Sequence, residues 1–343
     1  MVRLLLLCVL LVAPIPAAAD LLLPPGFTSE LYVSGDGVDQ GTPRGIGGIP
    51  SVSTLAFDRT GVLYLARTGR RYVGGQEVED VWPIYRIPVG GARFTAATEP
   101  RFFYGPPLPN PQVGAVRGDR ELFVTTFDRE RKIGVLYRMV DGTAELFAGG
   151  TPPRGTPPLL RQPEGVAVDD AGNVFVVDRQ QGVVLRLDAS GRVVDPEYVK
   201  LTRPRVLALD GTRLWVGADG PAEAPWLKGP GEIWRVEPGR EAELVRRGPM
   251  PAAMAVGPGG RLYIADRQAA QVFMLAPDGS SSEFARFTDG DAPRSLGFAP
   301  VTPETRQAGI AGDLFVVVIR RNGWPVNEIL RVTGPFDRFG IPR

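Results

Sequence analysis

The strongest constraint on the fold of this chain is a strand-rich unit that recurs along it. Residues 162–194 read QPEGVAVDDAGNVFVVDRQQGVVLRLDASGRVV, in which apolar runs alternate with turns rich in Asp and Gly. Such short apolar runs between turn signals are typical of β-strands. Residues 251–283, PAAMAVGPGGRLYIADRQAAQVFMLAPDGSSSE, share the same skeleton 88 residues further on. One such unit has an apolar face and nothing to pack against, so the fold requires several copies.

Weaker copies of this unit begin near residues 52, 111, 204 and 293, which makes six units at a period of roughly 40–60 residues. The period predicts an all-β fold, a six-bladed β-propeller formed as one domain by residues 20–343. The last unit is one strand short, and residues 27–35 (FTSELYVSG) form a strand without a neighbour in sequence. We therefore expect this N-terminal strand to close the last blade.

The first 19 residues have the parts of a secretory signal peptide. Arg3 supplies a positive charge, residues 4–12 are apolar, and Ala17 to Ala19 form a small-residue cleavage motif before Asp20. The apolar run is about half of the ~20 residues that span a bilayer. We therefore expect an exported protein, periplasmic or extracellular, with no membrane span once residues 1–19 are removed.

The chain contains no histidine, and its single cysteine, Cys8, lies inside the predicted signal peptide. Histidine is the usual general base near neutral pH and the commonest metal ligand. Its absence excludes a Ser-His-Asp triad, a His-ligated zinc site and a haem with an axial His. Removal of Cys8 also excludes disulfides and thiol chemistry in the mature chain. The net charge of +1 gives no reason to expect a nucleic-acid partner.

Alignment of the six units on the GVAV run places one residue from each at the mouth of the central channel. Together these residues carry one carboxylate and two guanidinium groups, and no set of metal ligands is predicted. Two interpretations are open. In one, these side chains pair with one another and hydrogen-bond the backbone at the channel neck. In the other, they form a polar funnel for an anionic or polyhydroxylated ligand. The six residues are Ser53, Gln112, Glu164, Arg205, Ala252 and Arg294.

Three units carry insertions between their second and third strands, and each insertion contains one tryptophan, Trp82, Trp226 or Trp324. Insertions confined to one face of a repeat fold usually mark its binding face. Tryptophan there offers a stacking plane for a sugar or an anchor for a protein partner. The alternative is that each tryptophan holds its own loop against the blade.

Several aspartates stand at the ends of predicted strands, directly before turns. Asp side chains in this position hydrogen-bond the turn backbone. We expect this structural role, rather than catalysis, for Asp169, Asp170, Asp178 and Asp266.

The repeat resembles the NHL class of six-bladed propellers over nearly the whole mature chain, which implies a fold and little chemistry. A narrower resemblance links four stretches to the soluble quinoprotein sugar dehydrogenases, the glucose/sorbosone dehydrogenase family. It implies a pyrroloquinoline quinone cofactor on the channel face, Ca²⁺ beside it, Arg and Lys on the cofactor carboxylates, and a His base. The stretches are LLLPPGFTSELYVSG, LAFDRTGVLYLARTGRR, RPRVLALDGTRLWVGADGPAEAPWLKGPGEIWRV and GDLFVVVIRRNGWPVNEILRV.

In this resemblance Arg203 would match the arginine of the family's RNP motif, with Arg205 close by. The histidine positions differ: the chain has Pro109-Asn110, Asp219 and the IRRNGW turn in their place. Asp219 could in principle replace one histidine as a base. A missing general base costs roughly 10²–10⁴-fold in rate, so these differences argue against a shared mechanism.

Three functions follow from this comparison of residues. The first is an exported, sugar-dehydrogenase-like propeller that binds a small polar or sugar-like ligand, or a protein partner, on its channel face. The second is a diverged quinoprotein sugar oxidoreductase, with Arg203, Arg205 and Arg294 on the cofactor. The third is a Ca²⁺-dependent lactonase resembling the gluconolactonase propellers, for which Glu164 and Gln112 would supply oxygen ligands.

Overall fold

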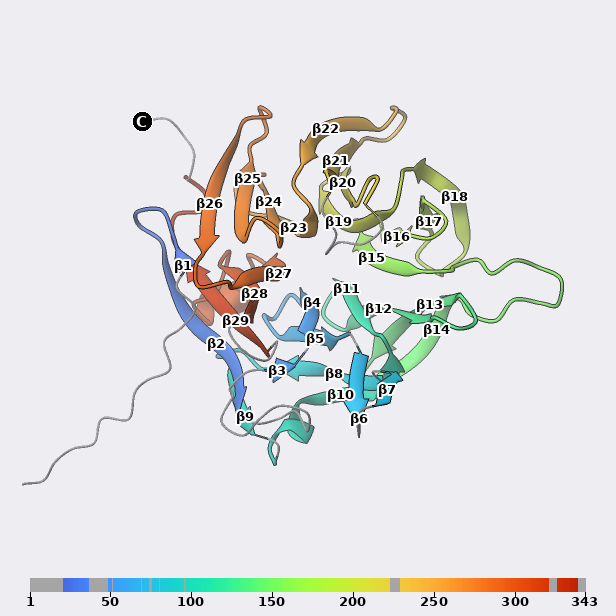
Figure 1. Cartoon of the computed structure of the whole chain (residues 1–343), viewed down its shortest axis with the longest axis horizontal. Coiled ribbons are helices and arrows are strands. Elements are labelled where there is room, and N and C mark those ends of the chain that lie inside the picture. The colour runs from blue at the N-terminus through green and yellow to red at the C-terminus, as the bar shows by residue number, and fades with distance from the viewer. Residues whose placement is uncertain are drawn as a thin grey trace, which may run out of the picture.

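The structure, a computed structural model, describes residues 21–36, 49–50, 52–68, 70–73, 76–79, 81–95, 97–222, 229–320 and 326–338. Six β-sheets stand around a central axis, and the predicted six-bladed β-propeller is confirmed (Figure 1). A 3₁₀ helix, η1 (Glu99–Phe102), and one short α-helix, α1 (Pro303–Gln307), lie in connections. No helix in the described ranges is both long and apolar enough to cross a membrane.

Each blade has four main strands, ordered from the axis outward. Blade 1 contains β4 (Val52–Phe57), β5 (Leu63–Arg67), β8 (Val81–Ile87) and β10 (Phe103–Pro109). Blade 2 contains β11 (Gln112–Arg117), β12 (Glu121–Asp128), β13 (Ile133–Val140) and β14 (Thr143–Gly149). Blade 3 contains β15 (Pro163–Val168), β16 (Val174–Asp178), β17 (Val183–Leu187) and β18 (Val193–Lys200).

The second half of the ring follows the same plan. Blade 4 contains β19 (Pro204–Asp210), β20 (Arg213–Ala218), β21 (Gly231–Val236) and β22 (Glu243–Gly248). Blade 5 contains β23 (Pro251–Val256), β24 (Leu262–Asp266), β25 (Gln271–Leu275) and β26 (Ser281–Phe287). Blade 6 contains β27 (Ala292–Phe298), β28 (Leu314–Arg320), β29 (Val326–Thr333) and β2 (Thr28–Asp36).

Short additional strands extend or flank these sheets. β1 (Leu21–Leu22) adds to blade 5, while β3 (Ile49–Pro50) and β9 (Ala92–Thr95) add to blade 6. The insertion of blade 1 forms a separate hairpin of β6 (Arg70–Val73) and β7 (Gln76–Glu79).

The core consists of six apolar clusters, each lying between two neighbouring blades. Strand β16 shows how one strand serves two of them. Val174 and Val176 pack toward blade 2, whereas Phe175 and Val177 pack toward blade 4. Successive side chains of a strand point to opposite faces, and both faces of a blade are covered in this ring. This explains why the second strands are continuous apolar runs.

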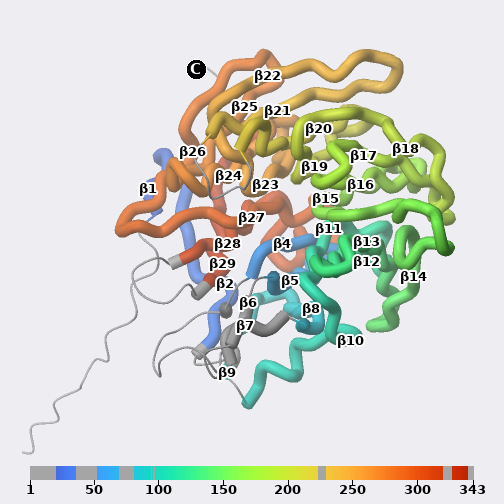
Figure 2. The backbone as a smooth tube through the Cα atoms, turned by 45° about the vertical axis from the view of Figure 1, so that its right-hand side comes forward, coloured from blue at the N-terminus to red at the C-terminus, as the bar shows by residue number. Residues whose placement is uncertain are grey.

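The N-terminal strand closes the ring, as predicted. β2 pairs antiparallel with β29 as the outer strand of blade 6, with Leu31 opposite Leu330. Both views show β2 lying against β29, the last strand of the chain (Figures 1 and 2). Full closure gives each blade a neighbour on both of its faces and leaves only the outermost strands as sheet edges.

Aromatic side chains from both ends of the chain reinforce this closure. The Phe27 ring lies 4.9 Å from that of Phe336 and 5.1 Å from that of Phe284, in edge-on contacts. All three rings are buried. Edge-on pairs contribute about 0.5–1.5 kcal/mol each beyond the burial of their area. The N-terminal and C-terminal segments are therefore held by side-chain packing as well as by the β2–β29 ladder.

Substitution Phe27→Ala should lower the free energy of unfolding by about 3–5 kcal/mol, because it removes a buried ring from this cluster. Urea unfolding followed by tryptophan fluorescence measures the change. Leu146→Ala is the control, since Leu146 is 62% exposed and its loss should cost within about 0.5 kcal/mol. Equal losses for the two variants would contradict a role of Phe27 in closure.

Candidate functional site

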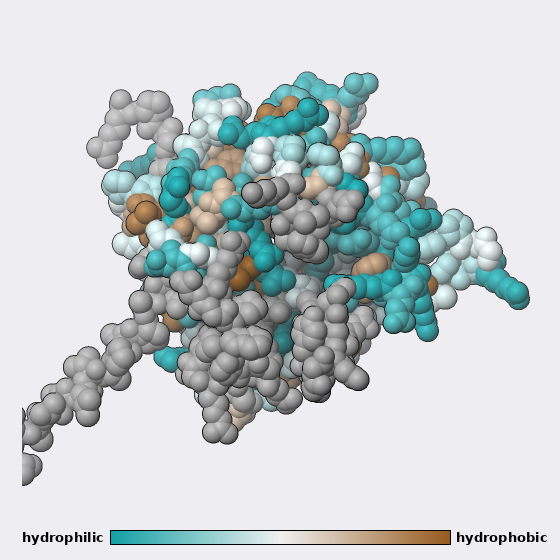
Figure 3. Space-filling view, viewed as in Figure 1, coloured by the Kyte–Doolittle hydropathy of each residue, from teal (hydrophilic) through white to brown (hydrophobic). Residues whose placement is uncertain are grey.

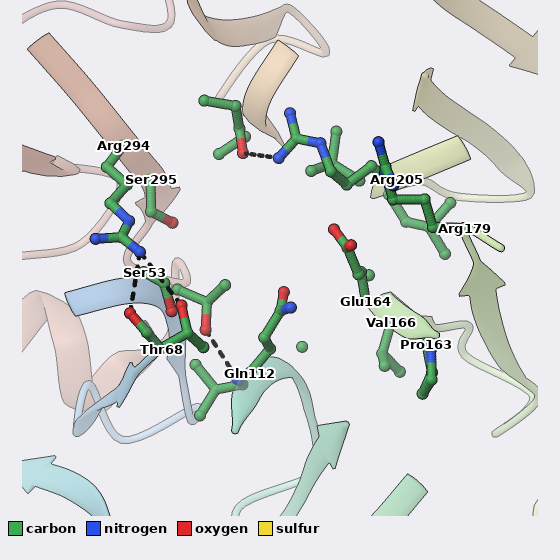
Figure 4. Close-up of a pocket in the computed structure, with 18 of the residues that line it drawn as sticks. Ser53, Thr68, Gln112, Pro163, Glu164, Val166, Arg179, Arg205, Arg294 and Ser295 are labelled. Atoms are coloured by element: carbon green, nitrogen blue, oxygen red, sulfur yellow. Dashed lines mark hydrogen bonds between the residues drawn. The ribbon is translucent and has the colours of Figure 1, made fainter. Parts of the chain in front are cut away.

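A cavity of about 560 Å³ lies at the central channel. Its wall consists of the starts of the six inner strands and the turns between second and third strands. All six residues predicted at the channel mouth line it, and Figure 4 shows Glu164, Arg205 and Arg294 among its wall residues. The six are Ser53, Gln112, Glu164, Arg205, Ala252 and Arg294.

A β-bulge at the channel residue occurs in the inner strand of five of the six blades. In blade 4, Pro204 pairs with Ala218 and Val206 with Gly217, so Arg205 has no partner residue on β20. In blade 2 the irregularity lies at Gly114 instead, and Gln112 is paired with Thr125. The extra residue of a bulge is withdrawn from the hydrogen-bonded ladder, which allows its side chain to be re-aimed.

Proline precedes the channel residue in five of the six units. Proline has no N–H to donate to a ladder and is tolerated at the first residue of a strand. These prolines are therefore a sequence signal for the channel positions, independent of the GVAV alignment. The five are Pro111, Pro163, Pro204, Pro251 and Pro293.

Inner strands of neighbouring blades approach closely just behind these residues. A Cβ atom on Gly165 would lie 2.8 Å from the carbonyl oxygen of Arg205, and one on Gly114 would lie 2.4 Å from Cβ of Val166. The glycines of the repeated motif therefore allow close contact between blades at the channel neck.

Three arginines that the sequence pattern alone did not single out also line the cavity: Arg129, Arg179 and Arg267. They come from the turns after β12, β16 and β24. Each follows an aspartate at the end of the second strand, so the Asp-Arg dipeptide recurs in blades 2, 3 and 5. This recurring dipeptide is the sequence signal for the three arginines. The expected turn role explains its aspartate but not its arginine.

The predicted turn role of the strand-end aspartates is confirmed at three positions. Asp178 Oδ1 accepts from Gln181 N at 2.9 Å, and Asp169 Oδ1 accepts from Asn173 N at 2.8 Å. Asp266 Oδ1 accepts from the backbone N–H groups of residues 268 and 269. Asp170 is exposed.

Asp219 does not line the cavity, which corrects its expected position. It is fully buried between blades 3 and 4, where it accepts from Arg179 Nε at 2.9 Å and from Arg205 Nε at 2.8 Å. Each of its oxygens thus contacts one guanidinium group. Asp219 holds both arginines at the cavity wall and is not placed to act as a base in the cavity.

Arg203 also lies away from the cavity. Its backbone has φ +52°, and its Nη1 donates to the carbonyl oxygens of Gly220, Pro221 and Ala222 at 3.0–3.3 Å. These contacts satisfy the backbone of the blade 4 insertion. The expected match to a cofactor-binding arginine is therefore not reproduced in space.

Trp82 is the third residue whose expected position changes. Its ring lies against the buried guanidinium of Arg67, 3.8 Å from ring centroid to Cζ, and it does not line the cavity. Arg67 Nη1 in turn donates to the hydroxyl of Tyr85. Trp82 lies on β8, the third main strand of blade 1, and not in the insertion before it. Trp226 and Trp324 lie outside the described residues.

Arg205 and Arg294 bridge neighbouring blades while lining the cavity. Arg205 donates to the carbonyl oxygens of Pro251 and Ala252 in blade 5. Arg294 Nη2 donates to the carbonyl and hydroxyl oxygens of Thr68 in blade 1, at 3.3 and 3.2 Å (Figure 4). A guanidinium has five N–H donors, and Arg205 uses three in the described contacts. The channel residues can therefore hydrogen-bond the backbone and still offer donors to a ligand, so the two alternatives from the sequence do not exclude each other.

Glu164 is the carboxylate that lines the cavity among the described residues. Its Oε1 accepts from Gln162 Nε2 at 2.9 Å. Burial raises the pKa of Glu164 to about 7, and the nearby guanidinium groups of Arg205 and Arg179 only partly oppose this. A burial effect of this kind disfavours the charged form. Near neutral pH the group is divided between its protonated and ionised forms.

The residues present do not fit Ca²⁺. The described part of the chain has no cluster of three or more Asp, Glu, His or Cys side chains that could hold a metal ion. Calcium takes six to eight oxygen ligands, whereas Glu164 shares the cavity with several guanidinium groups that repel a cation. These groups would suit the carboxylates of a quinone cofactor, but the metal implied beside it has no ligand set among the described residues.

No protein-family model matches the sequence, and no curated protein does. Solved structures do match. A PQQ-bound aldose sugar dehydrogenase from Streptomyces coelicolor is 12% identical with a TM-score of 0.57, over 91% of this chain and 100% of that chain. An auxiliary nutrient binding protein from Bacteroides ovatus is 10% identical with a TM-score of 0.60, over 90% and 77%. A putative gluconolactonase is 15% identical with a TM-score of 0.54, over 91% and 94%.

The likeness is one of fold. The expected similarity to sugar-dehydrogenase and gluconolactonase propellers is confirmed at this level, over 91% of this chain in both cases. One scaffold carries proteins named for a dehydrogenase, a lactonase and nutrient binding. Fold alone therefore does not assign the chemistry, and the site must do so.

Asp219→Asn should lower the free energy of unfolding by about 3–5 kcal/mol, because Arg179 and Arg205 then lose their buried counter-charge. Urea unfolding at pH 7 measures the loss. Glu145→Gln is the matched control: its carboxylate is 52% exposed and pairs with Arg138, and such exposed pairs contribute about 0–1 kcal/mol. A loss for Asp219→Asn no larger than the control would show that the two arginines do not depend on Asp219.

Proposed function

We propose that this protein binds a small, anionic, hydroxylated ligand in the channel cavity. The observation that carries the proposal is the distribution of positive charge. Five of the six blades each contribute one arginine to the same cavity, while Glu164 is its described carboxylate. The arginines are Arg129, Arg179, Arg205, Arg267 and Arg294.

The setting of these arginines strengthens their effect on an anion. The cavity is walled by protein on several sides, and charges interact more strongly where water is displaced. Guanidinium groups pair with carboxylates through two parallel hydrogen bonds. A cavity of about 560 Å³ has the size of ordinary small-molecule sites.

Blade 1 contributes hydroxyl groups in place of an arginine. Ser53, Thr54 and Thr68 line its side of the cavity, with Gln112 next to them on blade 2. Hydroxyl and amide groups both donate and accept hydrogen bonds. A ligand that carries hydroxyl groups beside its charge, such as a sugar acid, matches this mixed lining better than an apolar anion.

The other hypotheses have less support from the site. The lactonase requires calcium ligands that the described residues lack. The oxidoreductase would use the same arginines on cofactor carboxylates, but the chain has no histidine to act as its base. A broad apolar surface would favour binding of a protein partner. On the face of the molecule shown in Figure 3, the apolar residues that the structure describes form small separate patches. The Bacteroides ovatus neighbour is named for nutrient binding, a use of this fold that needs no catalysis.

Calorimetric titration of the purified protein with D-glucarate, a hydroxylated dicarboxylate, tests the proposal. We expect saturable binding at about micromolar affinity that weakens with added salt. Arg294→Gln should weaken binding tenfold or more, since hydrogen bonds to charged groups contribute about 1.5–3 kcal/mol. Arg246→Gln is the control, because Arg246 lies on the blade 4 perimeter and does not line this cavity.

Two results would overturn this function. One is no binding of glucarate, sulfate or gluconate at low salt. The other is equal binding of uncharged glucose with no effect of Arg294→Gln. Thermal unfolding of both variants shows whether any loss of binding reflects a loss of fold.

The proposal includes export, and it rests on the signal-like residues 1–19. N-terminal sequencing of the protein from periplasmic and medium fractions tests this part. A chain that begins at Asp20 in either fraction is expected. A chain recovered only from the cytoplasm, with residues 1–19 still attached, would contradict export without bearing on the channel ligand.

A further inference from the structure

Glu164 lies near two arginines in the cavity wall but pairs with neither of them. In the described part of the chain, Arg179 and Arg205 form their ion pairs with Asp219. Gln162 is the described hydrogen-bond partner of the Glu164 carboxyl group. Figure 4 shows this carboxyl group directed into the cavity, toward the side where Arg205 and Arg179 lie.

A ligand carboxylate bound in this part of the cavity would lie beside Glu164. The nearby arginines Arg179 and Arg205 each already contact one oxygen of Asp219. If Glu164 stayed ionised, the ligand carboxylate would meet a like charge. When two carboxylates share one site, the pKa of one of them rises strongly. Bound carboxylate and ionised Glu164 therefore exclude each other.

The groups around Glu164 come from every neighbouring element. Gln162 precedes its own strand, Arg179 follows β16, and Arg205 and Asp219 belong to blade 4. Across the cavity lie Arg129, Arg267 and Arg294. Burial already raises the pKa of Glu164 to about 7 in the free protein, so protonation on binding requires a modest further shift.

We propose that the ligand carries a carboxylate that shares a proton with Glu164. The protonated Glu164 donates its O–H to one carboxylate oxygen of the ligand, while the other oxygen accepts from Arg205. Above neutral pH the proton comes from solvent, so binding takes up a proton. No bond of the ligand's carbon skeleton forms or breaks. This inference deepens the proposed function and rests on it.

The same geometry favours a carboxylate over sulfate. One O–H donor and the remaining N–H donors of Arg205 match a group with two oxygens and a single charge. Sulfate would bring two charges and further oxygens against the Glu164 carboxyl group. Glucarate and gluconate should therefore bind more tightly than sulfate at the same ionic strength.

Proton counting by calorimetry tests the inference, with glucarate titrated in two buffers of different ionisation enthalpy at pH 6 and pH 8. Carboxylates of this kind are ionised at both values, so an uptake reports on the protein. We expect close to one proton taken up at pH 8 and almost none at pH 6. Since binding requires the protonated form, affinity should fall about tenfold from pH 6 to pH 8, given a pKa of about 7.

Glu164→Gln separates this mechanism from general electrostatics. The amide is uncharged and still donates a hydrogen bond, so the variant should bind glucarate within about threefold of the parent at pH 6. Its affinity should not change between pH 6 and pH 8, and its proton uptake should vanish. Glu145→Gln, at an exposed glutamate, should keep the full pH dependence of the parent.

The outcomes distinguish this inference from the function on which it rests. Glucarate binding without proton uptake at pH 8, or uptake that persists in Glu164→Gln, overturns the shared proton and leaves anion binding intact. Sulfate binding as tightly as glucarate overturns the choice of a carboxylate. No binding of any anion overturns both proposals.

Discussion

The hydrogen-bonded ladder between β2 and β29 is the constraint on which the whole ring depends. It joins segments from the two ends of the chain, and the hydroxyl groups of Thr28 and Thr333, 305 positions apart, meet at 2.9 Å beside it. Each apolar cluster lies between two blades, so the ring has no complete core until this last pairing forms. The cavity depends on it too, because all six blades supply its wall. The channel cavity is therefore complete only when the two ends of the chain have paired.

Polar contacts near the axis join neighbouring blades and shape the cavity at the same time. The backbone N–H of Val113 donates to Thr54 Oγ1 at 2.8 Å, which joins blades 1 and 2. Thr125 Oγ1 donates to the carbonyl oxygen of Glu164 at 2.9 Å, which joins blades 2 and 3. Arginines make the corresponding links from blade 3 to 4, from 4 to 5 and from 6 to 1. Arginine suits this double role because its donors exceed what one structural contact requires.

Periodic features of the chain were predictable from the sequence, and features that depend on the paths of loops were not. The repeat established the number of blades and the starts of the inner strands, and the missing strand identified the closure. Alignment also placed Glu164, Arg205 and Arg294 on the channel. The burial of Asp219 between blades depends on the packing of two turns, which no repeat encodes. The Arg67–Trp82 contact likewise joins β5 to β8 across the insertion of blade 1, which no repeat encodes.

The bulges separate the frame of the propeller from its chemistry. In five blades the bulge leaves a residue outside the ladder at the start of the inner strand, usually close behind a proline, where its side chain faces the channel. A change at such a position alters what the channel attracts without breaking a strand pair, so long as blade-bridging contacts are replaced. Ala252, which offers no polar group, occupies one position of this ring, while Arg205 and Glu164 occupy two others. In a scaffold of this kind, single substitutions at the channel positions can change which ligand is recognised. The stability of the fold comes mainly from the apolar clusters between the blades.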